Sequence, residues 1–194
     1  MSTKKNLLEA KVTHVSDGDT LKANCDNGLT ITVRLDSIDA PEKAQPYGAE
    51  AKEALATLVL NKDIKIEQTA QDRYGRIVGK VYRGRTYVNE EMVKNGHAWV
   101  YQQYANEPTF AKLEEKAQQA KLGLWALPKA KRMPPWEWRK LQKEKSEAIQ
   151  AVKEMNKKSS TSWLSWVLGI IGVGAVAGVG YLWFTGQLSQ LLGG

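Results

Sequence analysis

The chain has 194 residues, of which 28 are Lys or Arg and 21 are Asp or Glu, so its formal net charge is +7. This length suits one folded domain with an appendage, and the basic balance favours anionic partners such as nucleic acid or a membrane surface. The single cysteine, Cys25, excludes an intramolecular disulfide, and the two histidines do not suffice for a His/Cys zinc cluster.

The first part of the sequence predicts three β-strands joined by tight turns. β-Branched and apolar residues alternate with polar ones over 10–15, 20–25 and 30–35. The Asn27-Gly28 pair between the second and third of these runs is a hairpin signal. In the third strand, Arg34 is expected to face away from the apolar side that carries Val33 and Leu35.

Helices and strands then alternate along the chain. The spacing of apolar residues predicts helices over 48–60, 88–95 and 109–121, and strands over 63–68 and 77–82. Gly123 is expected to cap the last of these helices. With the first three strands, this order predicts a small α+β domain, with a five-stranded Greek-key barrel as one arrangement of its strands.

The composition changes after Leu127. Residues 129–162 form a basic linker that includes a charged helical stretch from about 136 to 157. Residues 163–184 contain no charged residue, and as a helix they would span about 33 Å, enough for a hydrocarbon core of about 30 Å. Tryptophan and tyrosine stand near both ends of this segment, where membrane interfaces favour them. We therefore expect one C-terminal transmembrane helix, with a buried helix of a soluble protein as the alternative.

Charged residues gather at three points where loops leave predicted strands. These motifs are Asp17-Gly18-Asp19-Thr20, Arg34-Leu35-Asp36-Ser37-Ile38-Asp39-Ala40-Pro41-Glu42 and Arg73-Tyr74-Gly75-Arg76. Each one alone is typical of an ordinary turn or a solvated strand end. Together they supply what phosphodiester hydrolysis needs, namely carboxylates for a hard cation, a base for water, and guanidinium groups for phosphoryl oxygens.

The three motifs resemble those of the staphylococcal nuclease (thermonuclease) family, in the family's order and spacing. The family pattern is an Asp-Gly-Asp-Thr turn, an Arg-Leu strand end leading to Asp-x-Pro-Glu, and then Tyr-Gly-Arg. Segments 88–96 and 123–125 are also similar to the family. The resemblance covers about residues 9–128 and implies a five-stranded OB-fold barrel with three helices.

The resemblance also implies a calcium site and a catalytic set. Asp19 and Asp39 would bind Ca²⁺ through their carboxylates, and Ala40 through its carbonyl oxygen, at a position where the family often has Thr. Glu42 would act as the general base. The remaining catalytic groups, which would clamp the phosphate, are Arg34 and Arg76.

The expected substrates are DNA and RNA, cleaved to 3′-phosphate ends. Arg73 and Tyr74 match positions that contact a terminal phosphate of the bound nucleotide. Trp99 occupies a position where the family usually has a tyrosine lining the base pocket. Unpaired strands are the expected preference, because their bases can be splayed onto aromatic side chains.

Two other classes of function are alternatives to a nuclease. A binding module on an inactive nuclease fold would have lost acidic and arginine positions, and this sequence retains them. A membrane-anchored scaffold with a lipid-binding linker would account for residues 129–184 but not for the three motifs.

The orientation and assembly of the predicted anchor stay open. Lys153, Lys157 and Lys158 precede it and no charge follows it, which by the positive-inside rule places the domain in the cytoplasm. A weak calcium site instead suits the extracellular side, where calcium is abundant. The Gly174-xxx-Gly178 spacing allows close helix pairing, so a weak homodimer is an alternative to a monomer.

Overall fold

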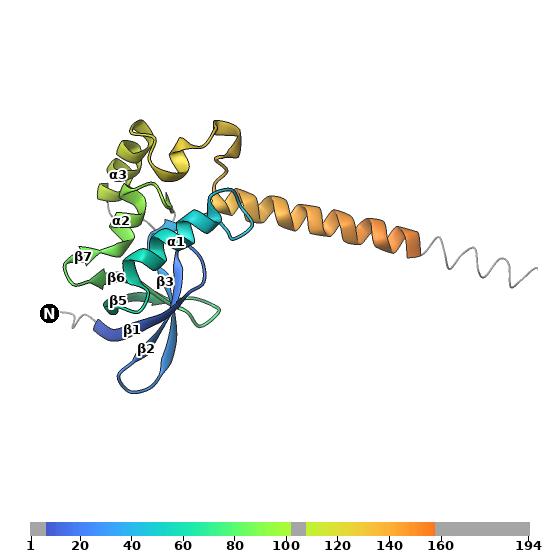
Figure 1. Ribbon diagram of the computed structural model, residues 1–194. Coiled ribbons are helices and arrows are strands. Elements are labelled where there is room, and N and C mark those ends of the chain that lie inside the picture. Colours follow the sequence, from blue (N-terminus) through green and yellow to red (C-terminus); the bar gives the residue numbers. More distant parts are fainter. Residues whose placement is uncertain (1–6, 102–107, 158–194) are drawn as a thin grey trace, which may run out of the picture. The chain divides into compact units, whose positions relative to one another are not determined.

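The computed structural model describes residues 7–101 and 108–157 of the chain (Figure 1). It divides into two units, Met1–Arg139 and Lys140–Gly194. The described strands all belong to the first unit, which also holds the three charged motifs of the sequence.

Five strands close into a barrel in the first unit. They are β1 (Leu7–Val15), β2 (Thr20–Cys25), β3 (Thr30–Leu35), β5 (Asp63–Gln71) and β6 (Ile77–Arg83). Strands β1, β2 and β3 form an antiparallel meander, and β5 pairs antiparallel with both β1 and β6. A parallel pairing of β3 with β6 closes the barrel. This topology, with the helices around it, confirms the α+β class and fits an OB-fold.

The alternation of apolar and polar residues explains how β3 serves both the core and the surface. Ile31, Val33 and Leu35 are buried, whereas Thr32 and Arg34 on the other face are only half-buried. Since successive side chains of a strand point to opposite faces, packing three of them inward directs Arg34 away from the core. The expected orientation of Arg34 is confirmed.

Three α-helices accompany the barrel, close to their predicted positions. They are α1 (Gly48–Val59), α2 (Val88–Lys94) and α3 (Pro108–Gln119). The buried residues of α1 include Ala51, Leu55 and Val59, which recur at helical spacing and join the barrel core. Helices α2 and α3 pack on each other beside the barrel (Figure 1).

The predicted cap at Gly123 is wrong. Helix α3 ends at Gln119, and the left-handed residue that follows it is Lys121, with φ of 52°. Gly123 instead begins the 3₁₀ helix η1 (Gly123–Ala126) and lies so close to Gly96 that an added Cβ would stand 2.2 Å from the Gly96 carbonyl oxygen. A glycine is therefore needed at position 123, because the two backbone segments pack closely. The Leu124 N–H donates a hydrogen bond to the Gly96 carbonyl at 2.8 Å and links the same two segments.

Three two-residue strands were not predicted. They are β4 (Ile38–Asp39), β7 (Thr86–Tyr87) and β8 (Trp99–Val100). Strand β4 pairs antiparallel with β8, so that Asp39 lies opposite Trp99. This short ladder fixes the backbone of Asp39 at the mouth of the barrel.

After η1, the chain forms a short 3₁₀ helix, η2 (Lys129–Lys131), and then a helix over 135–157 that corresponds to the expected charged helix. No helix within the described residues is long and apolar enough to cross a membrane. The transmembrane helix predicted at 163–184 lies outside the described residues, as does the end of the predicted linker.

Candidate active site

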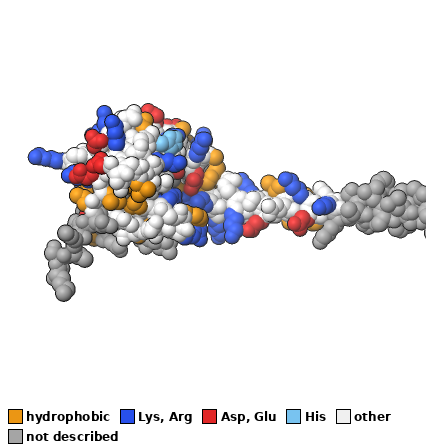
Figure 2. All heavy atoms as spheres, turned by 90° about the horizontal axis from the view of Figure 1, so that it is seen from below, with side chains coloured by type: hydrophobic (Ala, Val, Ile, Leu, Met, Phe, Trp, Pro, Cys, Tyr) orange, Lys and Arg blue, Asp and Glu red, His pale blue; other side chains and the backbone are white. Residues whose placement is uncertain are grey.

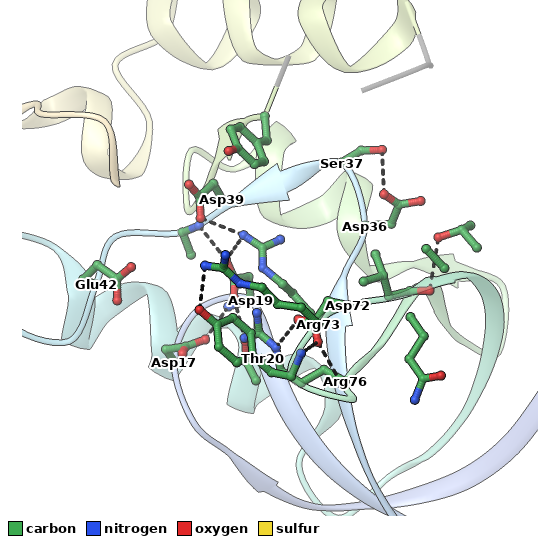
Figure 3. Close-up of a pocket in the computed structure, with 18 of the residues that line it drawn as sticks. Asp17, Asp19, Thr20, Asp36, Ser37, Asp39, Glu42, Asp72, Arg73 and Arg76 are labelled. Atoms are coloured by element: carbon green, nitrogen blue, oxygen red, sulfur yellow. Dashed lines mark hydrogen bonds and ion pairs between the residues drawn. The ribbon is translucent and has the colours of Figure 1, made fainter. Parts of the chain in front are cut away.

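The three charged motifs line one cleft of about 940 Å³ on the barrel (Figure 3). Its walls come from the turn after β1, the end of β3, β4 with the loop that follows it, and the β5–β6 turn. Eight of the nine residues assigned to the site from the sequence line it, the exception being Trp99. The eight are Asp19, Arg34, Asp39, Ala40, Glu42, Arg73, Tyr74 and Arg76.

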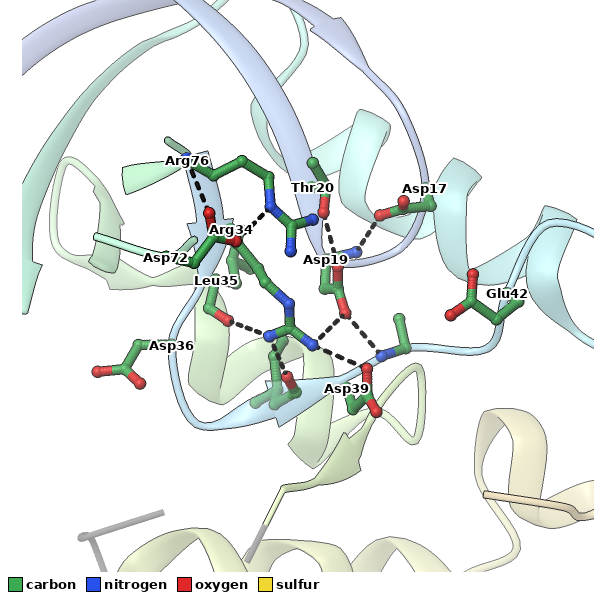
Figure 4. A network of polar contacts seen from close by, with 12 residues as sticks. Asp17, Asp19, Thr20, Arg34, Leu35, Asp36, Asp39, Glu42, Asp72 and Arg76 are labelled. Carbon is green, nitrogen blue, oxygen red and sulfur yellow. Dashed lines mark hydrogen bonds and ion pairs between the residues drawn. The ribbon is translucent and has the colours of Figure 1, made fainter. Parts of the chain in front are cut away.

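Two buried carboxylates converge on one arginine at the centre of the cleft (Figure 4). Asp19 is 7% exposed and Asp39 is 1% exposed. The Nη2 atom of Arg34 lies 2.8 Å from Asp39 Oδ1 and 3.4 Å from Asp19 Oδ2. Burial alone would lower the pKa of Arg34, but the charges of the two carboxylates raise it overall. The arginine therefore stays charged and neutralises part of the acidic centre.

Asp19 is oriented by hydrogen bonds from both sides. The Thr20 hydroxyl donates to Asp19 Oδ1 at 2.8 Å, and the Ala40 N–H donates to Asp19 Oδ2 at 3.1 Å. The turn that carries Asp19 can approach Ala40 because it contains Gly18, where an added Cβ would meet the Ala40 Cβ at 2.7 Å. The Asp-Gly-Asp turn thus brings a carboxylate against the β4 loop.

Burial, and after it repulsion from Asp19, acts to raise the pKa values of two carboxyl groups in the cleft. Burial, with the neighbouring charge of Asp19, raises the pKa of Asp17 to about 6. Burial also raises the pKa of Asp39, although arginine contacts oppose this rise. A cation bound among these groups would relieve both costs.

The oxygen atoms at this centre fit the donor preference of calcium. Ca²⁺ takes carboxylate and backbone carbonyl oxygens in flexible geometry, and the Asp19 and Asp39 carboxylates with the Ala40 carbonyl would provide such a set. Within the described residues, no group of three or more His, Cys, Asp or Glu side chains is arranged to hold a metal ion. Substrate or water oxygens would therefore have to complete the coordination.

Arg76 is positioned by Asp72, a residue to which the sequence motifs assign no role. Asp72 Oδ1 accepts hydrogen bonds from the N–H groups of Tyr74 and Arg76, both at 2.9 Å, and Oδ2 accepts from Arg76 Nε at 2.7 Å. Burial acts to raise the pKa of Asp72, but the hydrogen bonds from Arg76 and its charge lower it overall. An Asp at the start of a tight turn is the local signal that could have identified it.

Tyr74 and Arg73 form the outer wall of the cleft. Tyr74 is 69% exposed, and the Arg73 guanidinium carbon lies 4.8 Å from the centre of its ring. Arg73 Nη2 also donates to the Tyr74 hydroxyl at 2.7 Å. An exposed ring beside guanidinium groups provides a stacking surface together with cations for a phosphate.

Trp99 does not line the cleft. Its ring packs edge-on against Trp125, with ring centres 4.4 Å apart, and against Trp136 at 6.0 Å. The aromatic side chains that do line the cleft are Tyr74 and Tyr101. Tyr101 directly follows strand β8, two residues after Trp99. It can therefore provide the aromatic contact with a base that was expected of Trp99.

A fourth arginine, Arg139, enters the cleft from beyond the predicted nuclease domain. Its Nη2 lies 2.7 Å from Asp39 Oδ2, and its Nη1 lies 2.7 Å from Glu42 Oε1 and 3.2 Å from Asp39 Oδ1. Its contact with the cleft was not predicted, because no local pattern relates a helical arginine to carboxylates about 100 positions earlier.

Comparisons with known proteins agree with this fold and site. Residues 32–127 match the family model described as "Staphylococcal nuclease homologue". An uncharacterized endonuclease of Haemophilus influenzae is 40% identical over 133 residues, which are 69% of this chain and 74% of that protein. An uncharacterized endonuclease of Escherichia coli is 41% identical over 133 residues, 68% of this chain and 85% of that protein.

A third match is a plant protein. The probable staphylococcal-like nuclease CAN1 of Oryza sativa is 48% identical over 108 residues, which are 56% of this chain but 32% of that protein. A closed five-stranded barrel with a cleft of carboxylates and arginines defines an OB-fold protein of the nuclease type. The chain belongs to the staphylococcal nuclease family.

Proposed function

We propose that this protein is a calcium-dependent endonuclease that hydrolyses phosphodiester bonds of DNA and RNA, preferring single strands, to 3′-phosphate ends. The observation that carries the proposal is the convergence in one cleft of two buried carboxylates, a further carboxylate and two arginines. The names of the bacterial relatives, endonucleases, support the same reaction class.

The cation would be held by Asp19, Asp39 and the carbonyl oxygen of Ala40. Bound there, calcium supplies a positive charge that binds and polarises a phosphoryl oxygen. Magnesium is expected to serve poorly, because it demands a tight octahedral geometry and loses its waters reluctantly. The two carboxylates are already oriented by neighbouring hydrogen bonds, which favours binding without rearrangement of the loop.

Glu42 would accept a proton from the attacking water. The water oxygen forms a bond to phosphorus, the bond from phosphorus to the 5′ oxygen of the next nucleotide breaks, and the phosphate stays on the 3′ side. Arg34 and Arg76 would stabilise the charge that grows on the phosphoryl oxygens, since a guanidinium group donates two parallel hydrogen bonds to a phosphate.

The nucleic acid would be bound through its phosphates and unpaired bases. Arg73 and Tyr74 are proposed to contact a neighbouring phosphate, and the Tyr74 and Tyr101 rings to stack on bases. The contribution of Trp99 would then be indirect, through its packing near Tyr101. Lys and Arg side chains are spread over the visible surface among Asp and Glu (Figure 2), and the net charge of +7 favours an anionic substrate.

We further propose that residues 163–184 anchor the enzyme in a membrane, on the evidence of their uncharged sequence and its aromatic ends. The positive-inside rule favours a cytoplasmic nuclease domain. Protease accessibility in intact and opened cells tests this orientation, and digestion of the domain in intact cells would reverse it. Recovery of the protein from the soluble fraction would contradict the membrane anchor. Cross-linking tests whether the predicted anchor helices form a weak homodimer.

The test of the activity is digestion of denatured DNA, duplex DNA and RNA in calcium, in magnesium and in chelator. We expect cleavage in calcium, faster for denatured than for duplex DNA, and loss of at least two powers of ten in rate for Glu42→Gln. Full activity in chelator would contradict the metal assignment. Binding of nucleic acid without cleavage under any of these conditions would instead indicate a binding module.

A further inference from the structure

A short segment after the nuclease domain, residues 133–139, packs on the domain and brings its last residue, Arg139, into the cleft; this segment is named the strap. The Met133 carbonyl accepts a hydrogen bond from Gln45 Nε2, and Pro135 is buried. The Trp136 ring stacks on Tyr101, with centres 5.5 Å apart and planes at 18°. The strap is therefore fixed to the domain at several points before Arg139.

Gln45 links the strap to the loop of the general base. Gln45 is 6% exposed; its Oε1 accepts a hydrogen bond from the Glu42 N–H at 3.1 Å, and its Nε2 donates to the Met133 carbonyl. The position of the strap is thus coupled to that of Glu42. A loosely attached segment would not bury a polar side chain between itself and the loop.

The end of the strap places a guanidinium group on the proposed calcium ligand. Arg139 contacts both oxygens of Asp39 and one oxygen of Glu42, within 2.7 to 3.2 Å. Asp39 Oδ1 also accepts a hydrogen bond from Arg34, so neither oxygen of this carboxylate is without a cationic neighbour. Arg139 and Arg34 therefore share Asp39 Oδ1, and Arg139 alone of the two also binds Oδ2.

A calcium ion and Arg139 cannot share these oxygens without cost. Calcium binds carboxylate oxygens at about 2.3–2.6 Å, so a dication on Asp39 would stand beside guanidinium nitrogens that bind the same atoms. Like charges at this separation repel each other strongly inside a protein. The side chain of Arg139 is 43% exposed, so it can move into solvent when a cation arrives.

We propose that Arg139 is a built-in competitor of the cation: held in place by the strap, it neutralises Asp39 and Glu42 in the metal-free enzyme, and calcium binding releases it. This inference rests on the proposed calcium site. If Arg139 has this role, the strap is part of the active site. The strap then sets the calcium concentration at which the enzyme becomes active.

The size of the effect follows from occupancy. If Arg139 holds the carboxylates nine-tenths of the time, the apparent Kd for calcium is about tenfold weaker than that of the open site. Removing the guanidinium group of Arg139 should lower the apparent Kd for calcium by this factor. Loosening the strap without changing any charge should do the same.

The test is isothermal titration of the full-length protein, freed of metal, with calcium chloride. Arg139→Ala and Trp136→Ala should each bind calcium about tenfold more tightly than the wild type, and Arg139→Lys should fall between, because an ammonium group cannot bridge the two carboxylates as a fork. Lys131→Ala is the matched control: it removes one charge from the same region, at an exposed position, and should leave the Kd unchanged.

The outcomes separate this inference from the proposed function. Equal Kd values for the wild type, Arg139→Ala and Trp136→Ala would overturn the competitor role and leave the calcium site in place. An equal gain for Lys131→Ala would reduce the effect to general charge and also overturn it. Weaker binding by Arg139→Ala would show that the arginine supports the site. Absence of calcium binding in every variant would contradict the calcium assignment itself, and with it the inference.

Discussion

The guanidinium group of Arg34 lies 2.8 Å from Asp39 Oδ1, so a proposed phosphate ligand is also the counter-ion of a proposed calcium ligand. The same nitrogen reaches Asp19 at 3.4 Å, and Arg34 Nη1 donates to the Ile38 carbonyl at 3.0 Å. The roles of these residues are therefore not independent. Arg34 must hold the acidic centre together before metal and substrate bind, and changes at this residue should affect stability as well as turnover.

Arg34→Ala should lower both turnover and the stability of the metal-free protein. Loss of a phosphate clamp typically costs about two to four powers of ten in rate. Removal of one partner from a buried ion pair costs about 3 kcal/mol in unfolding free energy, because it leaves uncompensated charges. Calcium should raise the melting temperature of the variant by more than it raises that of the wild type. Thermal melts with and without calcium measure both increases. An unchanged melting temperature in chelator would contradict the counter-ion role.

Asp72→Asn should reduce turnover by positioning Arg76 less well. The asparagine can still accept the two backbone hydrogen bonds of the turn, but it loses the charged partner of Arg76 Nε. A displaced clamp of this kind costs about tenfold to a hundredfold in rate. The affinity for calcium should not change, since Asp72 is not part of the proposed calcium site. Asp36→Asn is the control, because Asp36 also lines the cleft but is not hydrogen-bonded to Arg76.

The sequence was sufficient for the barrel strands because their signals are local. Strands 20–25 and 30–35 were predicted with the bounds that the structure has, since the Asn27-Gly28 turn between them needs the positive φ of 80° that Gly28 adopts. The charged motifs were also recognisable, because each lies at a strand end and the barrel brings these ends together.

Features that depend on distant contacts were missed. The pairing of β4 with β8 involves two residues on each side, too few for any periodicity. Gly123 was expected to cap α3, but its conformation serves contact with Gly96, which a local pattern cannot show. Arg139 looked like one of many charges on a solvated helix, and its role depends on how the strap is fixed to the domain.

Asn89→Ala should strongly destabilise the domain. Asn89 is fully buried, its Oδ1 accepts from the Val81 N–H at 3.0 Å, and its Nδ2 donates to the carbonyls of Asp36 and Gly79 at 3.0 and 3.2 Å. The alanine leaves three backbone groups, two of them buried, without this partner, and we expect a loss of about 3 kcal/mol or more in unfolding free energy. Urea unfolding measures it. Asn24→Ala, at an exposed position on β2, is the matched control and should cost less than about 1 kcal/mol.

His97 should make the stability of the domain depend on pH in the weakly acidic range. Burial lowers the pKa of His97 below its ordinary value of 6.5, and its Nδ1 shares a hydrogen bond of 2.9 Å with the Tyr47 hydroxyl. Between the lowered pKa and 6.5, the unfolded chain binds more protons at this residue than the folded chain does. The contribution of His97 to stability is therefore fully present above pH 6.5 and is lost as the pH falls towards the lowered pKa.

Urea unfolding at pH 7.5, 6.5 and 5.5 measures this loss of unfolding free energy. His97→Gln is expected to show a shallower decline than the wild type. His14→Gln, at an exposed position on β1, is the control and should decline as the wild type does. Parallel declines for the wild type and His97→Gln would show that the carboxylates of the domain, and not His97, set its acid sensitivity.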